Sequence, residues 1–214
     1  MRRSLLVMLT LIISALAVTL LRRGKDNRLF KPIEELKVRI TSSVQVPDPT
    51  NIASAGDWYY LDHISSGLVA FDSNRQRFEP MMSDKWDTRA NGTHVFPLRP
   101  GASFHDGTPI TVKDVIWSIK RQLIRKTATH FRFWKYIKGC ENLKSLTDDC
   151  EGLFAISEHE VGIKLTDHSE SFYLQMASPE TGIFFAGDMN PKTADLKPTK
   201  FSGPYYVDKV GAVC

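Results

Sequence analysis

The sequence has few cysteines and none of the common catalytic motifs. Only 3 of its 214 residues are Cys, with no CxxC and no Cys/His cluster, which argues against a zinc site. Its six histidines never lie two or four residues apart, so no local pair of imidazoles is placed to hold a metal ion. The GxSxG, HExxH, Walker A and GxGxxG patterns are all missing. We therefore expect a protein that is not an enzyme and that uses no cofactor or metal.

Repeats, low-complexity runs and a basic domain are also missing. The composition, with 42% hydrophobic and 24% charged residues, is typical of globular proteins and excludes collagen-like or wholly disordered chains. The net charge of +4 comes from residues 1–25, which hold five basic residues and no acidic one. The remainder has 23 basic and 24 acidic residues, so we expect no nucleic-acid partner.

The N-terminal segment is apolar and flanked by arginines. Leu5–Leu21 contains no charged residue, and its 17 residues are near the lower limit for a membrane-spanning helix. A signal peptide with cleavage after Ala17 also fits, although Arg22 and Arg23 directly after the apolar run argue against cleavage. Residues 1–25 are thus expected to be a signal peptide or a membrane anchor. The rest would lie in the periplasm or on the outer face of the cytoplasmic membrane.

Cys140 and Cys150 are close in sequence, with nine residues between them. In an oxidising compartment they could form a disulfide that stabilises the fold by about 2–3 kcal/mol. Two buried free thiols are the alternative that the sequence leaves open.

Local signals predict alternating short strands and helices. Residues 26–35 are polar and predict a linker, residues 36–40 alternate as a strand, and residues 58–68 have helical spacing. Asn91-Gly92 predicts a hairpin and Asp106-Gly107 a second tight turn. Further along we expect a strand pair over residues 154–165, a short helix over 171–177 and a strand after Gly203-Pro204.

The clearest helix is expected to begin after Thr111. Thr111 is a good N-cap residue, and Asp114 three positions later completes a capping box. An apolar stripe follows, at Val112, Val115, Ile116, Ile119 and Leu123. On the opposite face, four basic residues are expected to point into water: Lys113, Lys120, Arg121 and Arg125.

An aromatic stretch at residues 127–136 follows this helix and is interleaved with basic residues. Such a stretch can stack on nucleic-acid bases, but the nearly neutral remainder of the chain favours packing in a core or a cleft.

An ordered series of motifs resembles one protein family. The series consists of SGLVAF at 66–71, FEPMMSDKW at 78–86, FPLRPG at 96–101, FHDGTPIT at 104–111, KDVIWSIK at 113–120 and GPY at 203–205. It is similar to family 5 of the bacterial extracellular solute-binding proteins, the peptide- and dipeptide-binding components of ABC importers. The resemblance covers about residues 36–210. In the FHDGTP motif we expect Asp106 and Gly107 to shape a turn.

The resemblance implies an α/β (mixed α+β) chain with a periplasmic binding protein-like type II fold. Family members are much longer, so only the first lobe and its inserted subdomain are expected here. Residues 36–50 and about 171–214 would belong to the first lobe, and about 51–170 to the subdomain.

The resemblance also implies a function and its partners. The chain would be part of an importer's substrate-binding component, with a peptide or other small solute as ligand and the membrane permease subunits as partners. The alternative is a membrane-tethered interaction domain that keeps the scaffold but binds no solute. The candidate ligand-binding residues are the loop Ala55, Gly56, Asp57, Trp58 and Tyr59, together with Phe131 and Trp134.

Overall fold

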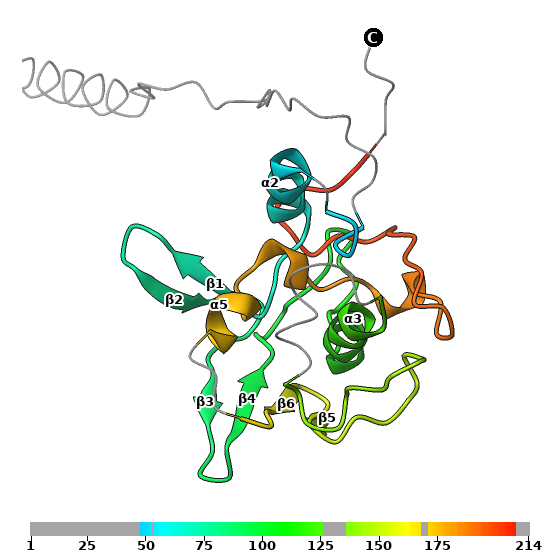
Figure 1. The fold of residues 1–214 in the computed structure, drawn as a ribbon. Helices are drawn as coiled ribbons and strands as arrows, with labels where there is room; N and C mark the ends of the chain where they lie inside the picture. The colour runs from blue at the N-terminus through cyan, green and yellow to red at the C-terminus, as the bar shows by residue number, and fades with distance from the viewer. Residues whose placement is uncertain (1–47, 53, 126–135, 168–170, 209–214) are drawn as a thin grey trace, which may run out of the picture. The chain divides into compact units, whose positions relative to one another are not determined.

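The computed structural model describes residues 48–52, 54–125, 136–167 and 171–208 (Figure 1). All of them belong to Ile40–Cys214, one of the two units into which the chain divides. The elements are α2 Ala55–Ile64, β1 Val69–Asp72, β2 Arg77–Pro80, β3 Asp87–Thr88, β4 Thr93–Pro97, α3 Val112–Arg125, β5 Leu153–Ser157, β6 Glu160–Lys164 and α5 Phe172–Met176, with two 3₁₀ turns, η1 Pro179–Thr181 and η2 Ala186–Asp188.

The strands form a four-stranded antiparallel sheet of order β3-β4-β6-β5 and a separate hairpin of β1 and β2. The predicted hairpin at Asn91-Gly92 is confirmed, since it joins β3 to β4 with Thr88 opposite His94. Gly92 has φ +78°, a left-handed conformation that favours glycine. The strand pair predicted over 154–165 is also confirmed, as β5 and β6. The architecture is therefore mixed α and β, as expected.

Helix α3 lies against the sheet, where it contacts β5 and β6 (Figure 1). Its side chains pack into two apolar clusters. The larger cluster contains the buried part of the predicted stripe, namely Val112, Val115, Ile119 and Leu123. The smaller cluster, around Leu61, Phe184 and Phe201, packs against Trp117 and Ile124 on another side of the same helix. A helix that is covered on several sides has little surface left that is exposed to solvent.

For that reason, one prediction about α3 is wrong. Of the four basic residues expected to face water, Lys113 is exposed and Arg125 is half-buried. Lys120 and Arg121, however, are only 8% and 1% exposed. Burying a cation is unfavourable unless it is paired and hydrogen-bonded, so these two side chains need partners.

The partners come from segments without regular secondary structure. Lys120 Nζ donates to the main-chain oxygen of Leu146, at 3.3 Å. Arg121 Nε donates to the main-chain oxygen of Ala194, at 2.8 Å, and its Nη2 forms a salt bridge with the carboxylate of Asp48. These partners lie 26 and 73 residues away in the sequence, which is why helical spacing alone could not indicate them.

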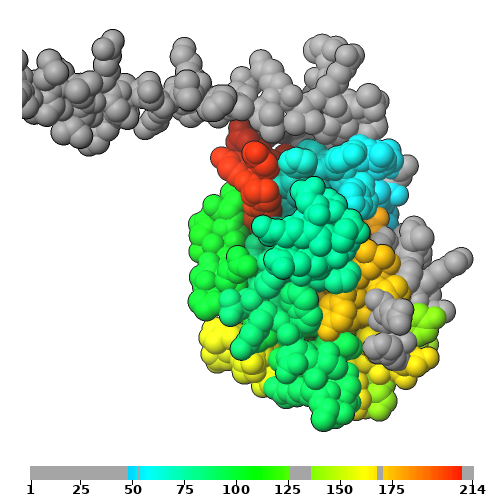
Figure 2. Space-filling view, turned by 90° about the vertical axis from the view of Figure 1, so that its left-hand side faces the viewer, coloured from blue at the N-terminus to red at the C-terminus, as the bar shows by residue number. Residues whose placement is uncertain are grey.

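The ends of the described chain lie together. Residues 205–207 form no strand, contrary to the prediction, and the segment instead bonds to the end of α2. The main-chain N–H of Gly203 donates to Ile64 O and that of Tyr205 to His63 O, both at 3.0 Å. Figure 2 shows this C-terminal segment, in red, against α2 at the end of the molecule where the described chain begins.

Cys140 and Cys150 form a disulfide in the structure, with their Cα atoms 4.9 Å apart. Both are nearly buried and belong to the larger apolar cluster. The bond closes the loop that carries Leu146, one of the partners of Lys120. The predicted strand over 36–40 lies outside the described residues, whereas the predicted helix over 171–177 is confirmed as α5.

The capping box of α3 is confirmed and yields a stability prediction. Asp114 N donates to Thr111 Oγ1 (3.3 Å), and Thr111 N donates to Asp114 Oδ2 (2.8 Å). The other carboxylate oxygen, Oδ1, accepts the buried N–H of Ala186 at 2.6 Å. Thr111→Ala is expected to lower the free energy of unfolding by about 1 kcal/mol. Asp114→Ala is expected to lower it by about 2–3 kcal/mol, because the Ala186 N–H also loses its acceptor.

Urea unfolding followed by circular dichroism measures both effects. Asp84→Ala is the matched control, because Asp84 is exposed and its carboxylate makes no hydrogen bond or ion pair within the described residues, so it should change little. Equal effects of Thr111→Ala and Asp114→Ala would show that the bond to Ala186 adds nothing.

Candidate functional site

The five candidate residues at 55–59 form a helix, not the loop that was expected. They are the first half of α2, which begins after Ser54. Ser54 Oγ accepts the N–H of Asp57 at 3.2 Å, and Asp57 Oδ2 accepts the N–H of Ser54 at 2.9 Å. The Asp57 carboxylate therefore serves a capping box, a pattern that was recognised for α3 but overlooked here.

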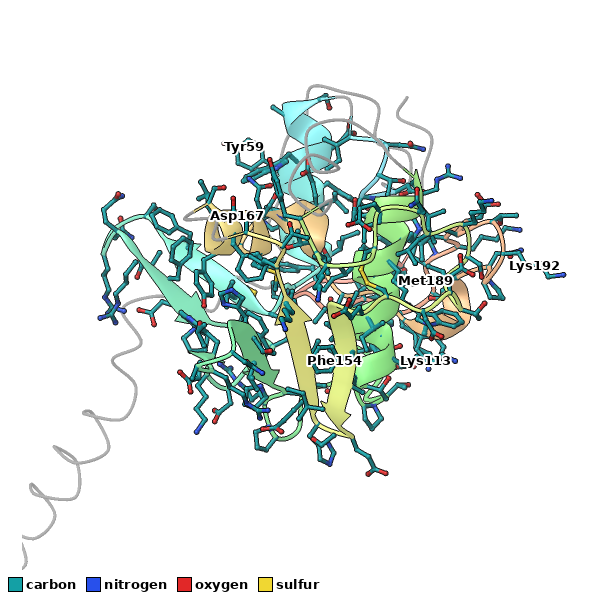
Figure 3. All side chains as sticks on the ribbon, turned by 60° about the horizontal axis from the view of Figure 1, so that its bottom comes forward. Tyr59, Lys113, Phe154, Asp167, Met189 and Lys192 are labelled. Carbon is teal, nitrogen blue, oxygen red and sulfur yellow. A yellow bond between two sulfur atoms is a disulfide. The ribbon has the colours of Figure 1, made fainter. Side chains whose placement is uncertain are left out.

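Within this segment, Trp58 and Tyr59 present large side chains to solvent. They are 41% and 62% exposed, and Figure 3 labels Tyr59 on α2. Trp58 lines a groove, described below, whereas Tyr59 is not among that groove's residues. The other aromatic candidates, Phe131 and Trp134, lie outside the described residues.

A groove of about 600 Å³ lies between α2, β1, α5 and η1, and we call it the α2–α5 groove. Its volume is in the range of small-molecule sites. It is lined by the side chains of Trp58, Asp62, Phe71 and Gln175, among others, and by the Ser178-Pro179 segment. The elements α2 and β1 are at least 100 residues from α5 and η1 in sequence, so only the folded chain brings these groups together.

Glu180 follows this segment and is only 8% exposed. Burial raises the pKa of its carboxyl to about 7, while a hydrogen bond from Ser178 Oγ acts in the opposite direction. Its main-chain oxygen accepts Gln122 Nε2 of α3 at 2.8 Å. The 3₁₀ turn η1 therefore contains a buried carboxyl group that changes its charge near neutral pH.

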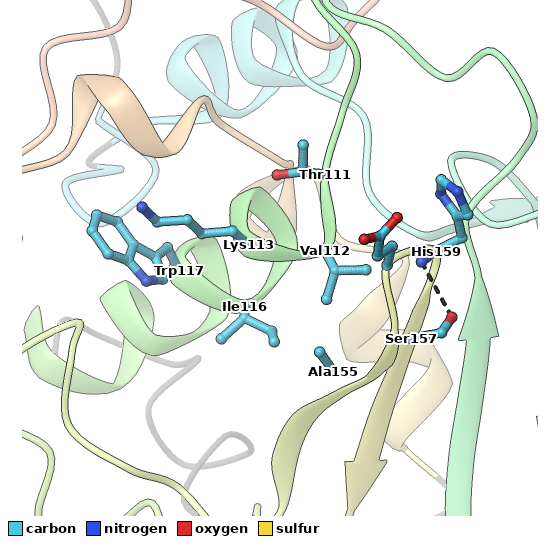
Figure 4. Close-up of a pocket in the computed structure, with 9 residues that line it drawn as sticks. Thr111, Val112, Lys113, Ile116, Trp117, Ala155, Ser157 and His159 are labelled. Atoms are coloured by element: carbon cyan, nitrogen blue, oxygen red, sulfur yellow. Dashed lines mark hydrogen bonds between the residues drawn. The ribbon is translucent and has the colours of Figure 1, made fainter.

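A second hollow of about 640 Å³ lies between the start of α3 and the β5–β6 hairpin (Figure 4). Val112, Ile116 and Ala155 give it an apolar lining. The polar groups that line the hollow contact one another. Lys113 Nζ lies 4.3 Å from the centre of the Trp117 ring, and the main-chain N–H of His159 donates to Ser157 Oγ. The hollow offers a packing surface without converging polar groups.

The FHDGTP segment has the architectural geometry that was expected. Gly107 has φ +84°, and Asp106 Oδ1 accepts the N–H of Thr108 at 2.9 Å. Lys200 Nζ lies 2.9 Å from Asp106 Oδ2. The hydrogen bond and charge of Lys200, with the bonds from Thr108, lower the pKa of Asp106. These contacts tie the turn to the returning chain near Phe201.

No three His, Cys, Asp or Glu side chains in the described part of the chain are arranged to hold a metal ion. The groups that the site does offer are aromatic surfaces, a carboxylate and an amide. Groups of these kinds can bind a solute.

The fold is that of the periplasmic binding proteins. The solved structure of the Escherichia coli murein tripeptide binding protein MppA matches with a TM-score of 0.56 and 21% sequence identity. The match covers 66% of this chain and 28% of that protein.

The chain belongs to the bacterial extracellular solute-binding proteins, family 5. The model of that family's middle region matches residues 77–212. This confirms the resemblance drawn from the motifs. The family consists of substrate-binding proteins, not enzymes.

Among curated relatives, the periplasmic murein peptide-binding protein MppA of Escherichia coli (strain K12) is 23% identical over 187 residues. The periplasmic oligopeptide-binding protein OppA of the same organism is 27% identical over 147 residues. These matches cover 80% and 65% of this chain, but only 35% and 26% of the relatives. The chain thus spans about a third of the length of the curated relatives it matches.

Several groups of the groove were not found from the sequence. Asp62 and Gln175 belong to no motif, and they come to line one groove only because α2 packs against η1 and α5 against β1. Glu180, in η1, belongs to no motif either, and what sets it apart is its burial. A helical pattern was recognised over residues 58–68, but the helix begins at Ala55, directly after its cap Ser54, and ends at Ile64.

Glu180 makes stability depend on pH. Because its pKa is raised from 4.5 to about 7 on folding, the folded state favours the neutral acid. The contribution of Glu180 to the free energy of unfolding is therefore most favourable below pH 4.5, and it falls as the pH rises from 4.5 through 7. Glu180→Gln keeps the neutral shape, so at pH 8 it should raise the free energy of unfolding by about 1–3 kcal/mol.

Urea unfolding at pH 5, 6, 7 and 8 tests this. The gain from Glu180→Gln should shrink towards zero at pH 5, and Glu141→Gln, at an exposed position, should show no such trend. A constant difference at all four values would contradict the raised pKa.

Proposed function

We propose that this chain is the N-terminal portion of the extracytoplasmic substrate-binding component of an ABC importer, and that the solute is a peptide. The observation that supports this most is the family match over residues 77–212. MppA and OppA are named as peptide-binding proteins. The partners are then a peptide or other small solute and the permease subunits in the membrane.

In this proposal, the first lobe consists of residues 36–50 and about 171–214, and the inserted subdomain consists of about 51–170. Residues 26–35 link this part of the chain to a signal peptide or membrane anchor at residues 1–25. The ligand lies between two hinged lobes, held by main-chain hydrogen bonds and aromatic walls. Of the candidates at 55–59, Trp58 and Tyr59 have the exposed side chains such walls require.

The 214-residue chain alone is expected to bind peptides weakly. A two-lobed binder surrounds its ligand and pairs its charged ends, and one lobe offers part of these contacts. Losing a single charged hydrogen bond weakens binding by about ten- to a hundredfold. Calorimetry with a mixture of di- to pentapeptides should therefore detect nothing submicromolar.

The same titration on a product of this gene that spans the length of the relatives is expected to show submicromolar binding. Submicromolar binding to the 214-residue chain would contradict the half-site interpretation. A gene that encodes no longer product, together with absent peptide binding, would favour the membrane-tethered interaction domain.

Export is the second expectation. No helix in the ranges described, 48–52, 54–125, 136–167 and 171–208, is long and apolar enough to cross a membrane, and residues 1–25 lie outside them. A fusion of residues 1–25 to alkaline phosphatase, which is active only after export, should be active in a bacterial cell. Leu11→Arg with Ile13→Arg interrupts the apolar run and should abolish that activity. Activity in both fusions, or in neither, would refute export by this segment.

A further inference from the structure

We propose that the α2–α5 groove binds a primary ammonium group, presented by the amino terminus or by a lysine side chain of a peptide. The inference deepens the proposed function and rests on it for the source of that group. It depends on three features of the groove: its charge, an amide oxygen without a donor, and its aromatic walls.

The charge of the groove is negative. Asp62 lines it, is exposed, and its carboxylate makes no hydrogen bond or ion pair with another described residue. None of the residues that line the groove is Lys, Arg or His. The hydroxyl of Ser65 already donates to the main-chain oxygen of Leu61 at 3.0 Å, and that of Ser178 is directed to Glu180. A cation therefore meets a carboxylate and no competing positive charge in this groove.

Gln175 supplies the second feature. Its side chain lines the groove, but its Oε1 atom is buried without a hydrogen-bond donor. A buried acceptor without a partner is unfavourable, and the terminal torsion of glutamine is soft. Rotation about that bond can turn the oxygen towards an ammonium group without breaking an existing bond of that oxygen. Binding thereby relieves an unfavourable state of the empty site.

Aromatic rings form the third feature. Trp58 and Phe71 line the groove and are 41% and 39% exposed, so each has ring surface open to a ligand. Cations are attracted to the faces of such rings, most strongly to that of Trp. A volume of about 600 Å³ also leaves room for the chain that carries the ammonium group.

The test uses the full 214-residue chain in a mild detergent and follows the indole N–H signal of Trp58 by NMR, assigned with Trp58→Phe. Alanyl-alanine amide presents only an amino terminus, and acetyl-lysine amide presents only a side-chain ammonium. Acetyl-norleucine amide matches the lysine probe without the charge, and acetyl-alanine presents a carboxylate. We expect one or both ammonium probes to shift the signal with millimolar affinity, and the last two probes to leave it unchanged.

Variants locate the binding. Asp62→Asn should raise the dissociation constant about threefold, because the carboxylate is exposed. Gln175→Met, which removes the acceptor at similar size, should raise it about tenfold. Asp84→Asn is the control and should have no effect, since Asp84 is exposed and does not line the groove. Circular dichroism shows whether each variant remains folded.

Equal binding of the uncharged probe, preference for the carboxylate, or affinity unchanged in both groove variants would overturn the proposal. Its failure is distinguishable from that of the proposed function. If no ammonium probe binds but the longer product binds peptides, the groove assignment alone is wrong. If the probes bind and the longer product binds no peptide, the proposed function fails and the ammonium site remains.

Discussion

The polar side chains of α3 hold together segments that have little regular structure of their own. Asp114 binds the N–H of Ala186, and Ser118 Oγ accepts the N–H of Phe184 at 3.0 Å. Lys120, Arg121 and Gln122 donate to main-chain oxygens of the segments at 146, 194 and 180. Buried main-chain groups must be paired, and outside sheets and helices side chains have to pair them. The side chains of α3 thus supply hydrogen-bond partners to the main chain of these loops, as a neighbouring strand does within a sheet.

This arrangement explains which parts of the fold could be predicted from the sequence. The Asn91-Gly92 hairpin and the Thr111–Asp114 cap depend on residues within a few positions of each other, and both are confirmed. The burial of Lys120 and Arg121 depends on oxygens far away in sequence, so a helical wheel placed them wrongly in water. The same holds for the groove, because Asp62 and Gln175 line one cavity only after α2 has packed against η1 and α5 against β1.

Family membership and local geometry describe different parts of the function. The motifs identified the family because turn and cap residues occur in a fixed order, and in the structure these residues shape turns and begin α3. The turn and cap residues of the FHDGTP segment do not line the α2–α5 groove, whereas the SGLVAF motif contributes Gly67 and Phe71 to it. The FHDGTP segment is therefore a marker of the scaffold, and the polar groups Asp62 and Gln175 of the groove come from outside the motifs.

The central position of α3 also determines when the domain can fold. Arg121 has partners 73 residues before and 73 residues after it, at Asp48 and Ala194, so its surroundings are complete only when nearly all of the described chain is available. Contacts between such distant residues require large loops to close first, which makes folding slow. A nascent chain that has not yet reached residue 194 lacks the main-chain oxygen that pairs Arg121 Nε, so the packing around α3 can be completed only late in synthesis.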